Sequence, residues 1–172
     1  MNLIWRMIWM FIAARFGARA DVMGEHKLAF RCLPTDLDIF MHMTNSRYSS
    51  FSDLSRVSFM IRNGAFGRLR SAGYFPVLGS STFRFRRPIW LFEKFTVSTS
   101  VLTWDDKWIY LLHKFETAKD MPAIAVVKAA FINTKTGRAP MDDVVRLMAY
   151  TGPRPESPIA KEVTDLDLVL KA

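Results

Sequence analysis

Residues 33–48 read LPTDLDIFMHMTNSRY, and they join a segment patterned like a strand to a segment patterned like a helix. Apolar and polar side chains alternate over residues 26–33, as they do in a half-buried β-strand. Residues 45–63 are followed by Gly64, a natural helix stop, and carry one helical stripe made of Phe51, Leu54, Ser58 and Ile61. The sequence therefore predicts a polar loop between a strand and a long helix.

Four more strands are predicted after this helix, and most of them are joined by short turns. They are residues 77–86, 95–103, 108–117 and 123–133. The last of these is almost continuously apolar, so we expect it inside the sheet. Because hairpins favour antiparallel pairing, the order predicts an α+β fold in which an antiparallel sheet of about five strands packs against one long helix.

The rest of the chain predicts smaller elements around this body. Residues 65–73 are expected to form a short helix or loop, and residues 140–150 a short helix. A Pro-rich linker follows, and the apolar spacing in residues 163–170 predicts a terminal helix. The expected organisation is an N-terminal segment (1–25), a single domain (26–150) and a linker with a tail (151–172).

Composition argues against several functional classes. The chain has 172 residues, a formal net charge of +8 and one cysteine, Cys32, so it contains no internal disulfide and no thiolate-rich metal site. A reducing, cytoplasmic location is the simpler expectation. Its three histidines are too scattered for a local ligand pair, and we predict no metal. The arginines accompany no nucleic-acid-binding motif, so phosphates on a small ligand or an anionic membrane surface suit this charge better.

Residues 2–20, NLIWRMIWMFIAARFGARA, favour a helix at an interface. Arg6 leaves too short an apolar run for a membrane span, and Arg15 and Arg19 lie where a signal peptide is normally neutral. Helical spacing aligns Leu3, Ile4, Met7, Ile8, Phe11 and Ile12, with Trp5 and Trp9 on the flank. Two placements stay open for this helix: docking on the body or a partner subunit, and peripheral contact with a membrane.

The loop of residues 36–45 carries the groups that suit acyl-thioester chemistry. It contains two carboxylates, Asp36 and Asp38, an imidazole, His42, and the amide of Asn45 at the expected helix start. A carboxylate can attack a thioester or activate water, while backbone N–H groups at a helix N-terminus can stabilise the oxyanion. Asp38 alternatively bonds only the backbone of its own loop, and His42 is either catalytic or a structural residue that pins the loop.

These residues resemble those of the hotdog-fold acyl thioesterases of the 4-hydroxybenzoyl-CoA thioesterase type. The matching signature is Asp36-x-Asp38 with Tyr48 ten residues after the second Asp. The longer pattern DLDxxxHMxNxRY is similar to that of the animal group related to thioesterase superfamily member six. The resemblance continues through Phe85-Arg86-Arg87, Leu91-Phe92-Glu93 and the turn at residues 104–106, over about residues 28–135.

The resemblance implies roles for three residues of the loop. Asp38 matches the nucleophile or general base, and Asn45 matches the residue whose backbone N–H polarises the thioester carbonyl. His42 matches a histidine of plant acyl-carrier-protein thioesterases, although Phe40 stands where those enzymes have Asn. Asp36 is expected to be structural.

Four further residues are candidates for substrate binding. Tyr48 is expected in the core or at the rim of the site, and Arg84, Arg86 and Arg87 are candidates to hold the phosphates of coenzyme A. The expected function is hydrolysis of a fatty or aromatic acyl-CoA or acyl-carrier-protein thioester, without a cofactor. The resemblance also implies a homodimer or a dimer of dimers.

Two other functions are alternatives to hydrolysis. Enoyl-thioester hydration occurs on the same fold, but it uses an Asp and His pair spaced differently from Asp38 and His42. A weakly catalytic or non-catalytic acyl-thioester-binding protein at a membrane surface is favoured by the Trp-rich N-terminus and by Phe40.

Overall fold

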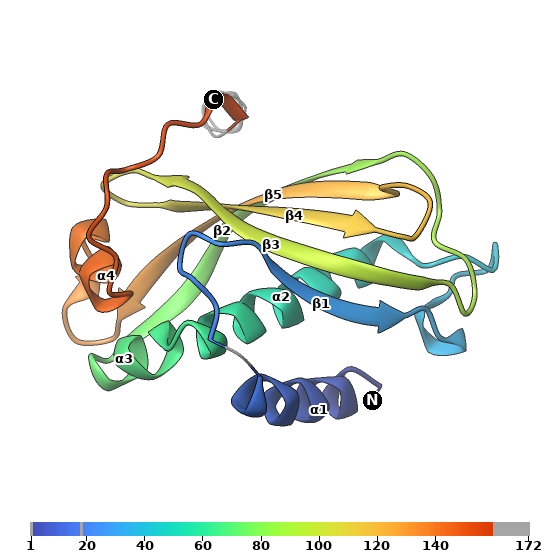
Figure 1. Cartoon of the computed structure of the whole chain (residues 1–172), viewed down its shortest axis with the longest axis horizontal. Coiled ribbons are helices and arrows are strands. Elements are labelled where there is room, and N and C mark those ends of the chain that lie inside the picture. The colour runs from blue at the N-terminus through green and yellow to red at the C-terminus, as the bar shows by residue number, and fades with distance from the viewer. Residues whose placement is uncertain (1, 18, 160–172) are drawn as a thin grey trace.

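The computed structural model describes residues 2–17 and 19–159, in which an antiparallel sheet packs against helices (Figure 1). The elements in chain order are α1 (Asn2–Phe16), β1 (His26–Arg31), the 3₁₀ helix η1 (Pro34–Asp36), α2 (Asn45–Arg62), α3 (Ala65–Ser71), β2 (Tyr74–Phe85), β3 (Lys94–Trp104), β4 (Ile109–Glu116), β5 (Ala123–Asn133), β6 (Gly137–Arg138) and α4 (Met141–Leu147). The strand order is β1-β3-β4-β5-β2, and the two-residue β6 pairs with β5. The predicted α+β class and antiparallel sheet are confirmed.

The strands lie where the sequence places them, with shifted ends. β1 ends at Arg31 because η1 starts soon after, at Pro34. β2 begins at Tyr74, earlier than predicted, because Gly73 adopts a positive φ of 78° that turns the chain from α3 directly into the sheet. β5 lies between β4 and β2, as expected for its apolar sequence. The predicted terminal helix at residues 163–170 lies outside the described residues, and the predicted domain boundaries stay a prediction.

The first two helices and the sheet form successive layers. α2 contacts β1 and β3 on one side and α1 on another, so it lies between α1 and the sheet (Figure 1). Its buried residues are Tyr48, Phe51, Ser52, Leu54, Ser55, Ser58 and Phe59. The Oγ of Ser55 lies 2.7 Å from the Oγ1 of Thr99 on β3, so the small serines allow close approach and also satisfy polar groups.

Buried apolar side chains form two clusters along α2. One contains Phe51, Phe95 and Phe115 near the helix start, and the other contains Phe59 and Phe131 toward its end. Burying each such ring stabilises the fold by about 2 kcal/mol. The two clusters fix α2 at both ends, and this holds the loop before it in place.

α1 docks on α2 through a narrow face. Met10 and Ala14 are buried there, at 3% and 4% exposure. Most of the stripe that helical spacing aligned, including Ile4 and Ile8, is exposed. Within the described residues, no helix combines the length and apolar character needed to cross a membrane. α1 is therefore attached to the body by one side and leaves apolar side chains on the other.

Candidate active site

The loop between β1 and α2 is folded by its own backbone into a tight turn. The Asp38 N–H donates to the His42 carbonyl at 3.0 Å, and the Met41 N–H donates to the Asp38 carbonyl at 3.1 Å. Met41 adopts a φ of 64°, which is uncommon for a residue with a side chain. The Met43 N–H donates to the Ile89 carbonyl at 2.8 Å and ties the loop to the β2–β3 connection. The turn thus holds Asp38 and His42 side by side.

The Asp38 carboxylate has one oxygen engaged by the turn and one directed at His42. Its Oδ1 accepts the Phe40 N–H at 2.9 Å, and its Oδ2 lies 3.3 Å from the His42 Nδ1. The Asp38 side chain is 27% exposed, so solvent or substrate can reach it. Asp38 therefore bonds its own loop and keeps a reachable oxygen, and its catalytic role stays a prediction.

Aromatic rings flank His42 on two sides. Phe40 stacks on its imidazole with ring centroids 6.1 Å apart, and Trp90 meets it edge-on at 5.9 Å. The His42 Nδ1 lies 3.4 Å from the Met43 carbonyl, besides its contact with Asp38. Asp38 and His42 thus form a pair with an apolar surround.

α2 begins three residues after His42 in the chain. Asn45 is its first residue and is exposed, and Thr44 makes no side-chain capping bond. The first N–H groups of a helix have no intrahelical acceptor. The Arg47 N–H nevertheless donates to the Thr44 carbonyl at 2.9 Å. Asn45 thus lies at the helix start where the sequence placed it, and oxyanion binding by its N–H stays a prediction.

Asp36, the other carboxylate of the loop, is a buried structural residue. Its Oδ2 lies 2.7 Å from Arg6 of α1 and accepts the Leu33 N–H at 2.9 Å, while Arg47 lies 3.5 Å from its Oδ1. The side chain is 2% exposed. Asp36 joins α1, the loop and α2, and it presents no free oxygen to a substrate.

Tyr48 lies in the core and is not at the mouth of the site. Its ring packs 4.9 Å from Phe85 and 5.0 Å from Phe115, and it is 2% exposed. Burial raises the pKa of its hydroxyl to about 12. The structure therefore favours the core role for Tyr48 and gives its substrate contact no support.

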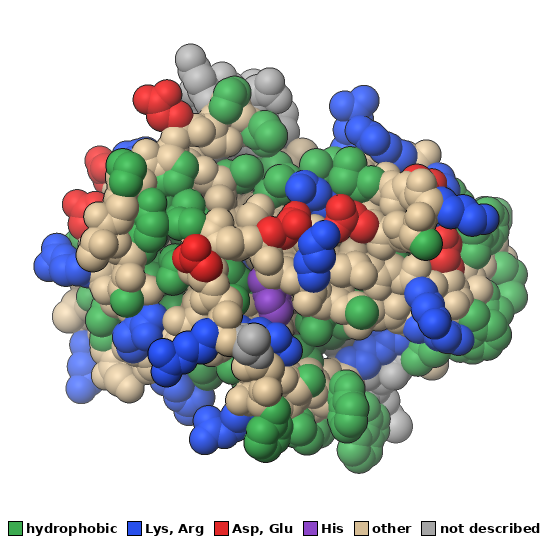
Figure 2. Space-filling view, viewed as in Figure 1, with side chains coloured by type: hydrophobic (Ala, Val, Ile, Leu, Met, Phe, Trp, Pro, Cys, Tyr) green, Lys and Arg blue, Asp and Glu red, His purple; other side chains and the backbone are tan. Residues whose placement is uncertain are grey.

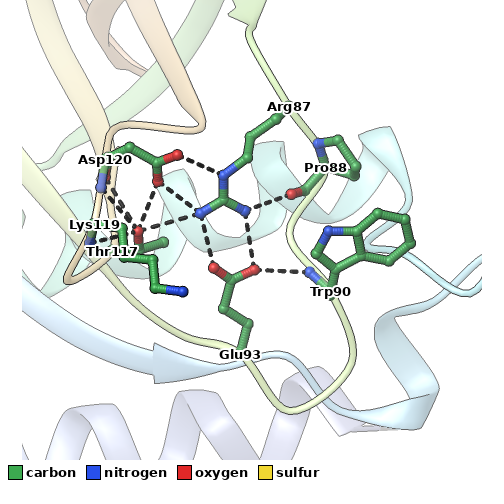
Figure 3. Close-up of polar contacts among 7 residues, drawn as sticks. All are labelled: Arg87, Pro88, Trp90, Glu93, Thr117, Lys119 and Asp120. Atoms are coloured by element: carbon green, nitrogen blue, oxygen red, sulfur yellow. Dashed lines mark hydrogen bonds and ion pairs between the residues drawn. The ribbon is translucent and has the colours of Figure 1, made fainter.

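The structure separates the three arginines predicted to hold phosphates. Arg84 and Arg86 are exposed, and no described acidic side chain pairs with them. Arg87 instead makes two parallel pairs of bonds, to Glu93 and to Asp120, and also donates to Thr117 and Pro88 (Figure 3). Because its guanidinium already bonds two carboxylates, Arg87 links the segments that carry Glu93 and Asp120 and is not available for a ligand phosphate.

Sequence reasoning gave no role to Glu93 and Trp90, which shape one wall of the site. Glu93 accepts both the Arg87 guanidinium and the Trp90 N–H, the latter at 3.0 Å (Figure 3). Trp90 in turn packs against His42 and pairs with it through the backbone. The opposite charges of Arg87 and Glu93, on either side of Pro88, were the signal available in the sequence.

An apolar cavity that the sequence did not reveal lies between α2 and the sheet. It has a volume of about 250 Å³ and is lined mainly by hydrophobic side chains of α2, β2, β4 and β5. Asp53 and Arg56 form an ion pair at its wall. Burial lowers the pKa of Arg56 and raises that of Asp53. Behind Arg56, burial lowers the pKa of His113 to about 3, so this imidazole is neutral at ordinary pH.

Over residues 2–17 and 19–159, no three His, Cys, Asp or Glu side chains come together as a metal site would need. The loop brings together a carboxylate and an imidazole and leads into a helix, and groups of this kind serve acyl transfer.

Comparisons with known proteins identify the family and the fold of the chain. The profile of the thioesterase-like superfamily matches residues 32–147. Protein THEM6 of Xenopus laevis is 39% identical over 100 residues, which are 58% of this chain and 48% of that protein. THEM6 of Drosophila melanogaster is 32% identical over 161 residues, covering 91% of this chain and 81% of that protein. The matched region thus spans about half the length of the Xenopus relative.

Solved structures show the same fold at lower sequence identity. A 1,4-dihydroxy-2-naphthoyl-CoA thioesterase from Synechocystis superposes with a TM-score of 0.63 and 12% identity, over 73% of this chain and 95% of that one. At this identity the likeness concerns the fold alone, and that fold is the hotdog fold predicted from residues 28–135. With its profile match over residues 32–147, the chain belongs to the thioesterase-like superfamily.

Proposed function

We propose that this protein hydrolyses acyl-CoA thioesters at Asp38. The observation that carries the proposal is the reachable Asp38 oxygen next to His42, in the loop that leads into α2. Asp38 attacks the thioester carbonyl or activates a water, and the Asn45 N–H binds the oxyanion that forms. One such donor lowers the barrier by about 3–4 kcal/mol.

The cavity beside α2 is a suitable place for the acyl group. Asp53, at its wall, follows Asn45 by eight residues, about 12 Å along a helix. An acyl chain that starts at the thioester and follows α2 reaches this cavity. Its apolar lining favours a fatty or aromatic acyl group over a polar one. The exposed Arg84 and Arg86 are the remaining candidates to bind phosphates of coenzyme A or acyl carrier protein.

Pairing of two copies along β2 is the oligomer that the sheet favours. β2 is at the end of the strand order, and it exposes Phe75, Leu78 and Phe85. An exposed edge strand is a template for pairing with another chain. We therefore propose a homodimer or a dimer of dimers as the active form.

A panel of acyl-CoA substrates tests the hydrolase proposal directly. Free thiol release is measured for the wild type, Asp38→Asn and the control Asp106→Asn, whose side chain is exposed in a turn. We expect Asp38→Asn to lower kcat/KM by about 10²–10⁴-fold, the usual contribution of such a group, and Asp106→Asn to change nothing. An inactive wild type, or an unimpaired Asp38→Asn, contradicts the proposal.

A second candidate is acyl-CoA binding at a membrane surface with little turnover. Phe40 is 69% exposed in the loop and α1 presents exposed tryptophans, which supports a peripheral membrane contact through residues 2–20. Calorimetry of acyl-CoA binding decides between the two: tight binding with no thiol release favours this candidate.

A further inference from the structure

A basic groove lies between the C-terminal ends of α1 and α2. It has a volume of about 400 Å³, and the side chains that define it are Phe11, Arg15, Arg19, Arg62 and Phe66. Figure 2 shows Lys and Arg side chains gathered around this end of α1, with hydrophobic side chains along the outer edge of the helix. The groove therefore joins a cluster of positive charge to an apolar surface.

The arginines of the groove have no acidic partner among the described residues. Arg15 and Arg19 are exposed, and no described carboxylate lies within ion-pair distance of either. Arg62 reaches only the Ala13 carbonyl, at 3.4 Å, and its buried Nε has no hydrogen-bond partner. Gly17 lies against the Arg62 guanidinium, where any Cβ would overlap it. The groove is thus lined by guanidinium groups whose charge no described carboxylate neutralises, and it suits an anion.

An apolar stripe on α1 adjoins these arginines. Trp5, Trp9, Ile12 and Phe16 follow one another at helical spacing and are 71%, 73%, 48% and 85% exposed. Tryptophan and phenylalanine beside arginine are the residues that place a helix in the headgroup region of a bilayer. A second copy of this chain suits the surface less well, because a two-fold contact through α1 would bring the two basic grooves together.

The groove is separate from the thioester site. Arg62 follows Asn45 by seventeen residues of α2, a distance of about 25 Å along the helix. The arginines proposed for coenzyme A, Arg84 and Arg86, lie at and just after the end of β2 and do not line the groove. The groove therefore requires a ligand of its own.

We infer that the groove binds the phosphate of an anionic phospholipid while the Trp5–Phe16 stripe lies at the acyl boundary of the same bilayer. This inference rests on the membrane contact proposed above and names its chemistry. Guanidinium groups of Arg15, Arg19 and Arg62 hold the headgroup phosphate, and the aromatic stripe supplies affinity that does not depend on charge. Because Arg6 of α1 bonds Asp36 of the catalytic loop, this docking fixes the loop close to the bilayer.

Vesicle co-sedimentation of the full chain tests the inference. Wild type is compared on phosphatidylcholine vesicles with and without phosphatidylserine, beside Arg15→Gln/Arg19→Gln and Trp5→Ala/Trp9→Ala. The control is Lys135→Gln/Arg154→Gln, which removes two exposed charges elsewhere. We expect binding that requires phosphatidylserine and weakens about fivefold for each arginine removed, roughly 25-fold for the pair, while the control is unaffected. The tryptophan variant should weaken binding to both kinds of vesicle.

Other outcomes overturn the inference in distinguishable ways. Equal binding to both vesicles, or an unaffected arginine variant, removes the headgroup site and leaves the membrane contact standing. Calorimetric binding of inorganic phosphate that Arg15→Gln/Arg19→Gln abolishes, while vesicle binding of that variant is unchanged, assigns the groove to a soluble anion. A dimer that Trp5→Ala/Trp9→Ala dissociates assigns the stripe to a second copy, and binding to neither vesicle overturns the membrane contact itself. Thiol release from soluble acyl-CoA, measured on the same samples, reports the hydrolase proposal independently.

Discussion

Asp36 and Asp38 are two residues apart and have opposite surroundings. Asp36 is 2% exposed and is held by two arginines and a backbone N–H, whereas Asp38 is 27% exposed and lies beside His42 in a loop. A buried carboxylate with all its partners in place supports a fold, and an accessible one is free to meet a substrate. The pair shows how one short motif supplies both the anchor of a site and its reactive group.

Removing the charge of Asp36 is the strongest way to test this contrast. We expect Asp36→Asn to lower the free energy of unfolding by about 3 kcal/mol, because the Arg6 guanidinium is left largely buried without its counter-charge. Asp38→Asn should change stability by less than about 0.5 kcal/mol, since an Asn oxygen can still accept the Phe40 N–H. Urea unfolding of both variants measures the difference. Equal losses would remove the distinction between anchor and reactive group.

The sequence was sufficient for most of the fold, because period-two and helical patterns are local. It placed the sheet strands and α2 within a few residues, and the family resemblance then favoured Asp38 over Asp36. It did not reveal that α1 docks through Met10 and Ala14, since nearly every position of that helix is apolar and periodicity cannot choose a face.

Arg87 shows why the rest of the site could not be predicted from the sequence. Arg84, Arg86 and Arg87 look alike in the sequence, yet only Arg87 bonds Glu93, six residues away, and Asp120, 33 residues away. The chain turns at Pro88, after β2 has ended, and brings together carboxylates from two different turns. The nearby charges of Arg87 and Glu93 give a local signal, but no local pattern encodes the contact with Asp120, so the complete clamp appears only in the fold.

His42 tests the reactive half of the contrast, with a smaller expected effect. We expect His42→Gln to lower kcat about tenfold with little change in KM, because Asp38 keeps its bond to the Phe40 N–H and loses only one of two contacts that orient it. Steady-state kinetics on the best acyl-CoA of the panel measure this. A loss as large as that of Asp38→Asn would instead make His42 a proton-transfer group in its own right.

The smallest effect is expected at the Arg87 clamp, which supports the wall of the site without touching the substrate. Hydrogen bonds from Arg87 lower the pKa of Asp120 to about 2 and also lower the pKa of Glu93. The stability that these carboxylates contribute is present above their ordinary pKa values of 3.8 and 4.5, and it is lost as the pH falls toward 2. Arg87→Lys keeps the charge but loses the two-pronged bonding, so we expect Tm at neutral pH to fall by about 2–4 °C.

The pH dependence distinguishes a clamp from a general loss of packing. In Arg87→Lys, Tm should vary less between pH 4.5 and 2 than it does in wild type, because the two carboxylates are then closer to their ordinary pKa values. Arg86→Lys is the matched control, since Arg86 is exposed and has no described acidic partner. If Arg87→Lys keeps the full acid dependence of wild type, the acid sensitivity arises elsewhere. The buried His26 and His113 are then the groups to examine, because burial lowers their pKa values to about 4 and about 3. Both are buried in the neutral form, so the folded protein loses stability as the pH falls below their ordinary pKa of 6.5.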